Sequence, residues 1–311
     1  MAEHTKPVHA VAFSPDGQLL ATGARDQIIH LWEVDSGNLL GSLHGHRHAI
    51  RSVCFSESGR TLIAGAGDWF DRGEVLVWDV QAATVRHALA RDGDAVDWVG
   101  HTTSDNEIAV VTGFGCGPRD PVEPTVRLYD VRSGRCRLTF QRENCFAVAP
   151  EGGSFAVGGP DCAIKLHRAN DGAPLGRLAA AMGNVLCVAF SASGELLLSA
   201  GFGRKEQGAV HLWDMSQGTI RRSFVFDDSA ISRAMFHSDD SIVATIGSEG
   251  GCRFWAVGTG ELLGETRESL RKRPNPKSIA ISPDGSLLAM TSSEAKGAIE
   301  LWDLGDLASV G

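Results

Sequence analysis

The chain has 311 residues, 43% of them hydrophobic, and a formal net charge of −9 at pH 7. This acidic balance argues against a broad phosphate-binding surface and against docking on an anionic membrane, because both need clustered Lys and Arg. We therefore expect no nucleic-acid partner and no membrane partner. The length is sufficient to bury a large core in one domain or in two.

Cysteine usage and the N-terminal sequence indicate a reducing compartment. The seven cysteines are an odd number, and none of them form the closely spaced pair of a zinc knuckle, so we expect free thiols. The N-terminus lacks the apolar core of a secretion signal, and no apolar run approaches the roughly 18 residues that span a bilayer. These features predict a cytoplasmic protein. The one basic run, Arg267 with Arg271, Lys272 and Arg273, is interpreted as a solvated loop.

Residues 11–34 hold a pattern that recurs along the chain. It consists of an apolar strand, a tight turn, a second strand, a polar turn and a third strand ending in Trp32. The third strand returns as IIHLWEV (28–34), EVLVWDV (74–80), TVRLYDV (125–131), AIKLHRA (163–169), AVHLWDM (209–215), GCRFWAV (251–257) and AIELWDL (298–304). Its aromatic residue, or a substitute, recurs at a mean spacing of 45 residues. Because one such repeat is too small to bury its own apolar face, neighbouring repeats must supply the core.

Each repeat predicts four short strands. The first strand and its turn recur as AFSPDG (12–17), CFSESG (54–59), VAPEGG (148–153), AFSASG (189–194), MFHSDD (235–240) and AISPDG (280–285). The third repeat is eroded to GHTTSDNE (100–107), which leaves its register open. A weaker fourth strand, such as NLLGSL (38–43), follows the third. Apolar, often β-branched runs separated by Gly, Asp, Ser and Pro are typical of strands and turns.

The seven spaced copies resemble the WD40-repeat family from about His4 to Leu304. The resemblance implies an all-β fold, a seven-bladed β-propeller whose blades are four-stranded antiparallel sheets. It also implies a single propeller domain over residues 1–311. The expected blades are roughly 4–44, 45–90, 91–140, 141–180, 181–225, 226–266 and 267–311.

The resemblance further implies a buried hydrogen-bond set within each blade. The first repeat offers all four members: His4 before the first strand, Thr22 on the second, Asp26 in the next turn and Trp32 on the third. His, Asp and Thr would also suit a catalytic triad. The same residue types recur in several repeats, however, whereas an active site needs one copy in one cleft. We therefore interpret the set as internal bracing.

Later repeats depart from this set. The second has Ala64 where Ser or Thr is expected, and the third and fourth have Tyr129 and His167 in the place of Trp. A partly satisfied buried polar network is costly. We expect the third and fourth blades to be the least stable.

Glycine-rich segments at 113–117 and 201–208 resemble phosphate-binding loops only superficially. Neither is followed by Lys-Ser/Thr or by a helix-forming segment. No unique cluster of acids, His or metal ligands stands out elsewhere. The sequence predicts no catalytic residues, no metal, no cofactor and no enzymatic activity.

One class of loop varies in length. Between the second strand and the marker residue, the first, fourth and sixth repeats have nine positions, and the second, third, fifth and seventh have 13, 16, 12 and 11. Insertions of this kind lie on one face of a propeller and often mark the binding face. Their large apolar and charged residues, which are typical of interface hot spots, are the candidate partner-binding residues: Trp69, Phe70, Asp71, Arg72, Phe114, Arg119, Phe202 and Arg204. The alternative is that the aromatic rings cover their own blade edges.

Trp98, at the first strand of the third repeat, is a further candidate for partner binding. The alternative, which we favour, is a core residue in the place that Val8, Ile50 and Val185 hold in other repeats.

The seventh repeat has few residues for a fourth strand. By analogy with NLLGSL this strand would begin near Ala308, and the sequence ends at Gly311. We expect either an open sheet edge, which would allow self-association with a second copy, or a trimmed piece of a longer protein.

Together these observations predict a rigid, non-catalytic protein–protein interaction scaffold, which presents loops on one face to partner proteins or peptides. One alternative is a sensor or regulatory module of a larger signalling protein. Another is a propeller hydrolase or lyase with a metal in its channel.

Overall fold

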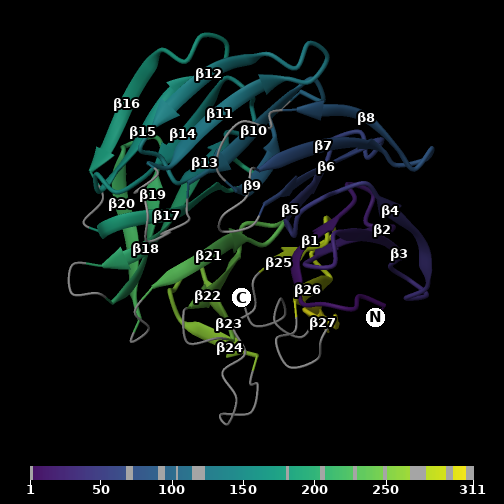
Figure 1. Cartoon of the computed structure of the whole chain (residues 1–311). Coiled ribbons are helices and arrows are strands. Elements are labelled where there is room, and N and C mark those ends of the chain that lie inside the picture. The colour runs from purple at the N-terminus through teal and green to yellow at the C-terminus, as the bar shows by residue number, and fades with distance from the viewer. Residues whose placement is uncertain are drawn as a thin grey trace. The chain divides into compact units, whose positions relative to one another are not determined.

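The computed structural model describes residues 3–67, 73–89, 95–102, 104–113, 123–179, 182–203, 207–226, 230–247, 251–266, 278–291 and 297–305. In these ranges the strands form seven antiparallel sheets, six with four strands and one with three (Figure 1). The fold is all-β, that of a seven-bladed β-propeller, as the resemblance to WD40 repeats implies. The chain divides into two compact units, residues 1–141 with 276–302 and residues 142–275 with 303–311.

The first unit contains four sheets, and in each the strands neighbour one another in chain order. Its first sheet contains β1 (Val8–Phe13), β2 (Leu19–Ala24), β3 (Ile28–Glu33) and β4 (Leu39–His44). Its second contains β5 (Ile50–Phe55), β6 (Thr61–Ala66), β7 (Glu74–Asp79) and β8 (Thr84–Leu89). Its third contains β9 (Val96–His101), β10 (Glu107–Thr112), β11 (Thr125–Asp130) and β12 (Cys136–Gln141). The seventh sheet of the chain contains β25 (Ile279–Ile281), β26 (Leu287–Thr291) and β27 (Ile299–Asp303).

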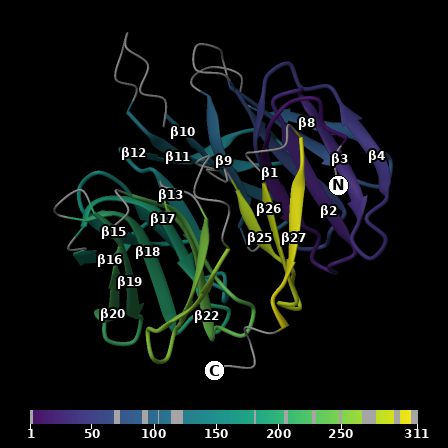
Figure 2. The ribbon, with the colours of Figure 1, turned by 90° about the horizontal axis from the view of Figure 1, so that it is seen from below.

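The seventh sheet packs beside the first, so the two ends of the repeat array meet in this unit (Figure 2). Buried side chains of the first sheet, among them Leu20 and Trp32, form one cluster with Ala289 and Ile299 of the seventh. Residues 306–311, where the fourth strand of the seventh sheet is expected, lie outside the described residues, as does the basic run at 267–273.

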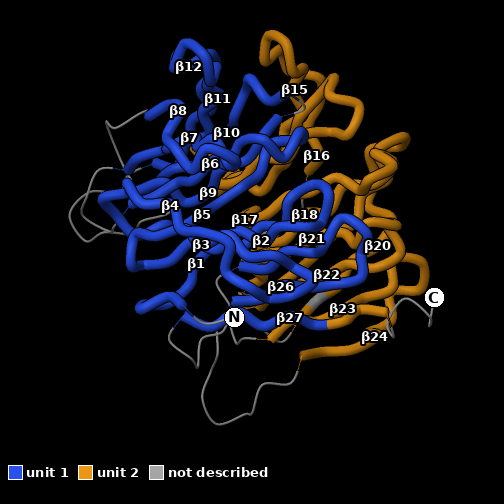
Figure 3. Tube along the Cα trace, turned by 90° about the vertical axis from the view of Figure 1, so that its right-hand side faces the viewer, with its two compact units in different colours: residues 1–141, 276–302 blue, residues 142–275, 303–311 orange. Residues whose placement is uncertain are grey.

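The second unit contains three sheets, orange in Figure 3. The fourth sheet of the chain contains β13 (Cys145–Val148), β14 (Ser154–Gly158), β15 (Ala163–Arg168) and β16 (Pro174–Ala179). The fifth contains β17 (Met182–Phe190), β18 (Leu196–Gly203), β19 (Gly208–Asp214) and β20 (Thr219–Val225). The sixth contains β21 (Ile231–Phe236), β22 (Ile242–Gly247), β23 (Cys252–Ala256) and β24 (Leu262–Glu265).

Glycines on the second strand allow neighbouring sheets to approach closely. A Cβ on Gly23 would lie 2.4 Å from Ile50 Cγ2, and a Cβ on Gly65 would lie 2.4 Å from Val96 Cγ1. Each partner is the first residue of the next sheet's first strand, and each is buried. The missing side chain on one repeat therefore makes room for a branched side chain of the next.

The tight turn between the first two strands is closed by its serine. In the first sheet, the backbone N–H of Leu19 donates to Ser14 Oγ at 2.9 Å, and the N–H of Gly17 donates to Ser14 O at 2.9 Å. Gly17 has φ +72°, a conformation that favours glycine. This accounts for the recurring Ser-x-x-Gly pattern of the repeats.

Candidate functional site

The predicted hydrogen-bond set of the first sheet lies around the side chain of Thr22. Thr22 Oγ1 lies 2.9 Å from His4 Nε2 and 2.9 Å from Trp32 Nε1, which donates to it. On the other side of the imidazole ring, His4 Nδ1 lies 3.1 Å from Asp26 Oδ2. Asp26 also accepts the backbone N–H of Thr5 at 2.9 Å. The four residues expected from the sequence meet in one network, in which Thr22 is completely buried.

The geometry assigns the protons of this network. Burial lowers the pKa of His4, although Asp26 opposes the shift. Burial alone would raise the pKa of Asp26, but the interaction with His4 and the hydrogen bond from Thr5 outweigh it and lower the pKa. A neutral His4 therefore donates from Nδ1 to an ionised Asp26 and accepts the hydroxyl proton of Thr22 at Nε2. Because the Thr22 hydroxyl both donates and accepts inside the sheet, it is not placed to attack a substrate.

The residue at the position of Thr22 determines whether the Trp of a sheet is hydrogen-bonded. In the fifth sheet, Trp213 Nε1 donates to Ser199 Oγ at 2.9 Å. In the sixth, Trp255 Nε1 donates to Thr245 Oγ1 at 3.1 Å. In the seventh, Met290 stands at this position, and Trp302 Nε1 is buried without a hydrogen-bond partner among the described residues.

The second sheet lacks the hydroxyl but has a substitute carboxylate. With Ala64 at the position of Thr22, His46 Nε2 and Trp78 Nε1 are both buried and find no partner in the described part of the chain. Glu74 replaces Asp26, accepting from His46 Nδ1 at 3.0 Å and from the Arg47 N–H at 2.6 Å. Sequence reasoning missed Glu74 because this carboxylate begins a strand instead of standing in the turn. The available signal was an acidic residue opening the apolar run EVLVW.

Hydrogen bonds keep Glu74 ionised in spite of its burial. Burial alone would raise its pKa, but the hydrogen bonds from His46 and the Arg47 N–H lower the pKa to about 2. Glu74 therefore acts as a fixed acceptor for the strand that enters the second sheet.

The fourth sheet replaces the histidine network with an ion-pair cluster. Lys165 stands opposite Val157 in the register, as His30 stands opposite Thr22. Its Nζ bonds to Glu143 Oε1 and lies 2.9 Å from Asp161 Oδ2. Burial raises the pKa of Glu143, although Lys165 opposes this shift. The cation on β15 thus joins the segment that precedes β13 to the turn between β14 and β15.

His167, at the Trp position of the fourth sheet, keeps the aromatic packing. Its ring stacks on Phe155 with centroids 5.5 Å apart, and its Nδ1 lies 2.9 Å from the carbonyl oxygen of Gly172. In the third sheet, Tyr129 occupies the Trp position and is buried.

Most of the predicted partner-binding residues lie outside the described residues: Trp69, Phe70, Asp71, Arg72, Phe114, Arg119 and Arg204. Phe202 is described, and the expectation that it lies in a loop is wrong. It pairs with Asn184 and Gly208 in the ladder of β17, β18 and β19, and it is half-buried. Backbone hydrogen bonding extends these strands into the predicted insertion.

Trp98 also departs from its expected place. Val96, and not Trp98, begins β9 and fills the position that Val8 and Ile50 hold in their sheets. Trp98 is half-buried, and its indole covers its own strand, so that a Cβ on Gly100 would lie 2.1 Å from Trp98 Cη2. Gly100 was the signal for this arrangement, because it leaves space for a large ring two residues away.

Three further chemical features bear on function. Within the described ranges, no group of three or more His, Cys, Asp or Glu side chains is arranged to hold a metal ion. The described cysteines, which exclude Cys116, are free thiols. A helix with the length and hydropathy needed to cross a bilayer does not occur among the described segments.

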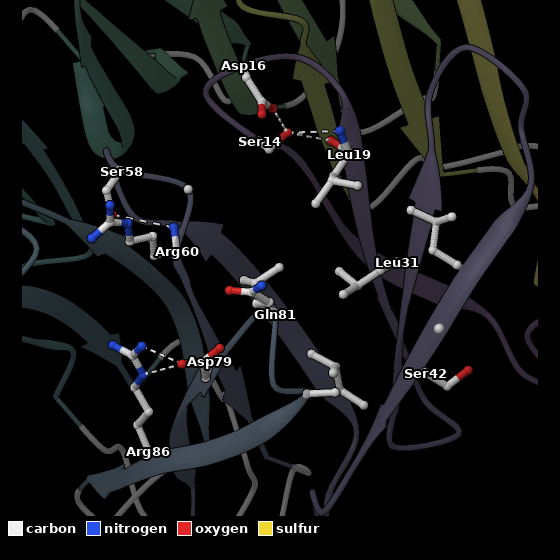
Figure 4. A pocket seen from close by; sticks show the side chains of 16 residues that line it. Ser14, Asp16, Leu19, Leu31, Ser42, Ser58, Arg60, Asp79, Gln81 and Arg86 are labelled. Carbon is white, nitrogen blue, oxygen red and sulfur yellow. Dashed lines mark hydrogen bonds and ion pairs between the residues drawn. The ribbon is translucent and has the colours of Figure 1, made fainter.

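A groove of about 760 Å³ opens between the first and second sheets (Figure 4). We call it the inter-sheet groove. The first sheet contributes the apolar side chains Leu19, Leu31, Leu40 and Leu43, together with Ser14, Asp16 and Ser42. The second sheet contributes the polar and charged side chains Ser58, Arg60, Asp79, Gln81 and Arg86, together with Val80 and Ala83. The groove therefore has one largely apolar wall and one largely charged wall.

Most of the groove's charges are bound within the protein. Arg86 forms an ion pair with Asp79, to which its Nε donates at 2.9 Å, and Asp79 Oδ1 accepts the backbone N–H of Ala82 at 2.8 Å. Asp16 Oδ1 accepts from Ser14 Oγ and from the N–H of Gln18 inside its own turn.

The groove lies at the opposite end of the sheets from the loops predicted to bind partners. It adjoins the turns between the first and second strands and between the third and fourth strands. The predicted insertions connect the second and third strands, at the other end of each sheet. Sequence reasoning missed the groove because its residues come from five separate segments of the chain. The one signal was the pair of consecutive leucines in NLLGSL, of which Leu40 is 57% exposed.

Comparison with known proteins agrees with the repeat architecture. The family model "WD domain, G-beta repeat" matches residues 1–33, 37–79 and 172–214. Autophagy-related protein 16 of Arabidopsis thaliana is 24% identical over 300 residues, which cover 94% of this chain and 55% of that protein. Protein tipD of Dictyostelium discoideum is 29% identical over 175 residues, covering 55% of this chain and 26% of that protein. Angio-associated migratory cell protein of Homo sapiens is 24% identical over 363 residues, covering 96% of this chain and 78% of that protein.

The chain thus spans about half the length of the Arabidopsis relative and about a quarter of the Dictyostelium relative. Proteins of this kind generally act as platforms for protein interaction. Seven antiparallel sheets follow seven sequence repeats, and repeats in the first, second and fifth sheets match the family model. In its repeats and its sheets, the chain is similar to the WD40-repeat family of β-propellers.

Proposed function

We propose that the protein is a non-catalytic scaffold that binds protein or peptide partners in the inter-sheet groove. The observation that carries this proposal is the contrast between the groove's two walls. An apolar wall supplies area to bury, and a charged wall supplies directional contacts, which is the usual composition of a protein-binding surface.

The buried polar groups of the sheets support a structural role over a catalytic one. His4, Thr22 and Asp26 are committed to one another, and His46 with Glu74 repeats the same contact in the next sheet. A catalytic constellation would need such groups to face a substrate in one place.

The names of the relatives also favour a scaffold. One is an autophagy-related protein, and a pre-rRNA-processing protein of Meyerozyma guilliermondii is 30% identical over 158 residues. The two names refer to different cellular processes. This favours a platform that binds different partners in different proteins over an enzyme with one shared reaction.

A regulatory module within a larger protein is the second candidate function. It is favoured by the share of the Arabidopsis and Dictyostelium relatives that the chain does not cover. In that case the groove would dock a segment of the same protein.

We further propose a cytoplasmic location, without a nucleic-acid or membrane partner, in line with the net charge of −9.

Self-association through the edge of the seventh sheet is also proposed. Light scattering checks it, because a mass independent of concentration would count against edge pairing.

Affinity purification from the native cell tests the scaffold proposal. Three tagged proteins are compared with wild type: a groove variant (Leu40→Asp with Arg60→Glu), a loop variant (Trp69→Ala, Phe70→Ala and Phe114→Ala) and a control (Leu175→Asp with Arg135→Glu). Leu175 and Arg135 are exposed residues outside the groove. We expect the groove variant to lose partners that wild type and control retain, whereas unchanged partners in every folded variant would overturn the proposal.

A further inference from the structure

We propose that the inter-sheet groove binds an extended peptide segment in which a large apolar residue stands directly beside an Asp or Glu. This inference rests on the proposed scaffold function and names the class of ligand. It follows from the position of Leu40, the charge of Arg60 and the direction of β4.

Leu40 supplies the apolar contact. It is the most exposed large hydrophobic side chain among the described residues, at 57%, and it lies on the groove wall. Leu31 and Leu43, which line the same wall, are buried. A ligand side chain placed against Leu40 would extend the packed core of the first sheet outward, which favours a large aliphatic or aromatic residue.

Arg60 supplies the charge. It is exposed, and among the described residues its guanidinium contacts no carboxylate, unlike that of Arg86, which is held by Asp79. Both oxygens of Asp79 accept hydrogen bonds, and one oxygen of Asp16 is bound in its own turn. Arg60 is therefore the cation of the charged wall that has no carboxylate partner among the described residues, and the geometry of its planar donor fork suits a ligand carboxylate.

The two walls face each other across the groove, which decides the ligand's conformation. In an extended chain, successive side chains point in opposite directions, so neighbouring apolar and acidic residues reach opposite walls. In a helix the two side chains would lie only about 100° apart.

The strand β4 favours an extended ligand as well. It is the outermost strand of its sheet in the described structure, so one edge of its backbone is unpaired. Its four consecutive residues from Leu40 to Leu43 all line the groove, which therefore follows the strand. At Gly41, a Cβ would meet nothing within 4 Å, so a second backbone has room to approach.

Fluorescence anisotropy with short synthetic peptides tests this inference on the full chain. Each peptide carries a central Leu followed by Glu, Gln or Lys in an otherwise identical Ser/Gly sequence, and a fourth has Leu and Glu separated by one residue. We expect the Leu-Glu peptide to bind about tenfold more tightly than the Leu-Gln peptide, because it gains a charge-assisted hydrogen bond. The Leu-Lys and spaced peptides should bind more weakly still.

Charge reversal provides the decisive control. Arg60→Glu should invert the preference, so that Leu-Lys binds better than Leu-Glu, and Leu40→Asp should weaken every peptide. Arg135→Glu and Leu175→Asp should leave all affinities unchanged. No binding to the wild-type chain, or an order of affinities that Arg60→Glu leaves unchanged, would overturn the inference.

The two proposals can fail separately. If no peptide binds, but the groove variant still loses its cellular partners, the peptide class is wrong and the scaffold function stands. If the peptides bind in the expected order, but no cellular partner depends on the groove or the loops, the scaffold proposal falls.

Discussion

A single hydroxyl, that of Thr22, connects two buried nitrogen atoms of the first sheet. It accepts the N–H of Trp32 and donates to Nε2 of His4. The second sheet, with Ala64 in this place, leaves the corresponding atoms of His46 and Trp78 without a partner among the described residues. The two sheets are thus a natural comparison of a satisfied and an unsatisfied network.

Thr22→Ala should lower the free energy of unfolding by about 2 kcal/mol or more, because it leaves two buried polar atoms unpaired. Urea denaturation followed by Trp fluorescence measures the change, with the midpoint falling while the slope stays constant. Thr22→Ser is the control, since it keeps the hydroxyl and should cost much less. Equal losses for the two variants would show that the methyl group matters more than the hydrogen bonds.

The reverse substitution, Ala64→Thr, should raise the free energy of unfolding by about 1 kcal/mol. The new hydroxyl would stand between His46 Nε2 and Trp78 Nε1, as Thr22 does between its own partners. The same urea titration measures the gain, and Ala64→Val, similar in size without the hydroxyl, is the matched control. A loss of stability for Ala64→Thr would indicate that the site has no space for the side chain.

Glu74 should make stability depend on pH in the acid range. Its folded-state pKa is lowered from 4.5 to about 2, so its contribution is complete above pH 4.5 and is lost as the pH falls toward 2. Glu74→Gln keeps the acceptor oxygen but removes the charge, and it should be less stable than wild type at pH 7. We expect this difference to shrink at pH 3 in chemical denaturation, and a difference independent of pH would contradict the assignment.

At the scale of elements, the contact between Gly65 and Val96 joins the second and third sheets. A Cβ on Gly65 would come within 2.4 Å of Val96 Cγ1 and 2.8 Å of Val99 Cγ1. Both valines are buried, so neither can move away freely.

Gly65→Ala should therefore destabilise the protein by about 1–3 kcal/mol through overpacking. Gly41→Ala, on an outer strand with open space around its Cβ, is the control and should be neutral or slightly stabilising. Thermal unfolding of the two variants beside wild type gives the comparison. A Gly65→Ala protein as stable as the Gly41→Ala protein would show that the sheets can separate at little cost.

The sequence predicts the sheets well because each depends on a local, repeated pattern. The strands around Trp32, Trp78 and Trp213 lie where the repeats place them. The hydrogen-bond network of the first sheet could be predicted from the sequence for the same reason. Residues that depart from the pattern are harder to predict. Periodicity predicts a loop at Phe202 because it does not reveal how far hydrogen-bonded strands continue. The turn of the third repeat departs from the Ser-x-x-Gly pattern, so the repeats do not define the register at Trp98.

The groove could not be predicted from the sequence. Leu40 and Arg60 come from different repeats, and neither belongs to the shared pattern. Their approach depends on how two adjacent sheets diverge toward their outer strands, which no single repeat encodes. The loop residues Trp69, Phe70 and Phe114 stay a prediction from the sequence.

At the scale of the whole molecule, the sheets should differ in local stability. The first has a complete network around Thr22, whereas the third has Tyr129 and the fourth has His167 at the Trp position. We expect native-state hydrogen exchange at low urea to show openings of lower free energy in the third and fourth sheets than in the first. Equal protection in all three sheets would contradict this expectation.

The contacts between neighbouring sheets limit where segments of such a chain can be exchanged for those of another. Two of these contacts pair Gly23 with Ile50 and Gly65 with Val96. Each pair is split between two sheets, so a crossover at a sheet boundary separates a glycine from the side chain that fills its space. A crossover in the turn between the first and second strands keeps every pair together. A segment that runs from the second strand of one sheet to the first strand of the next therefore keeps these glycine contacts intact when it is exchanged, and its boundaries differ from those of a sheet.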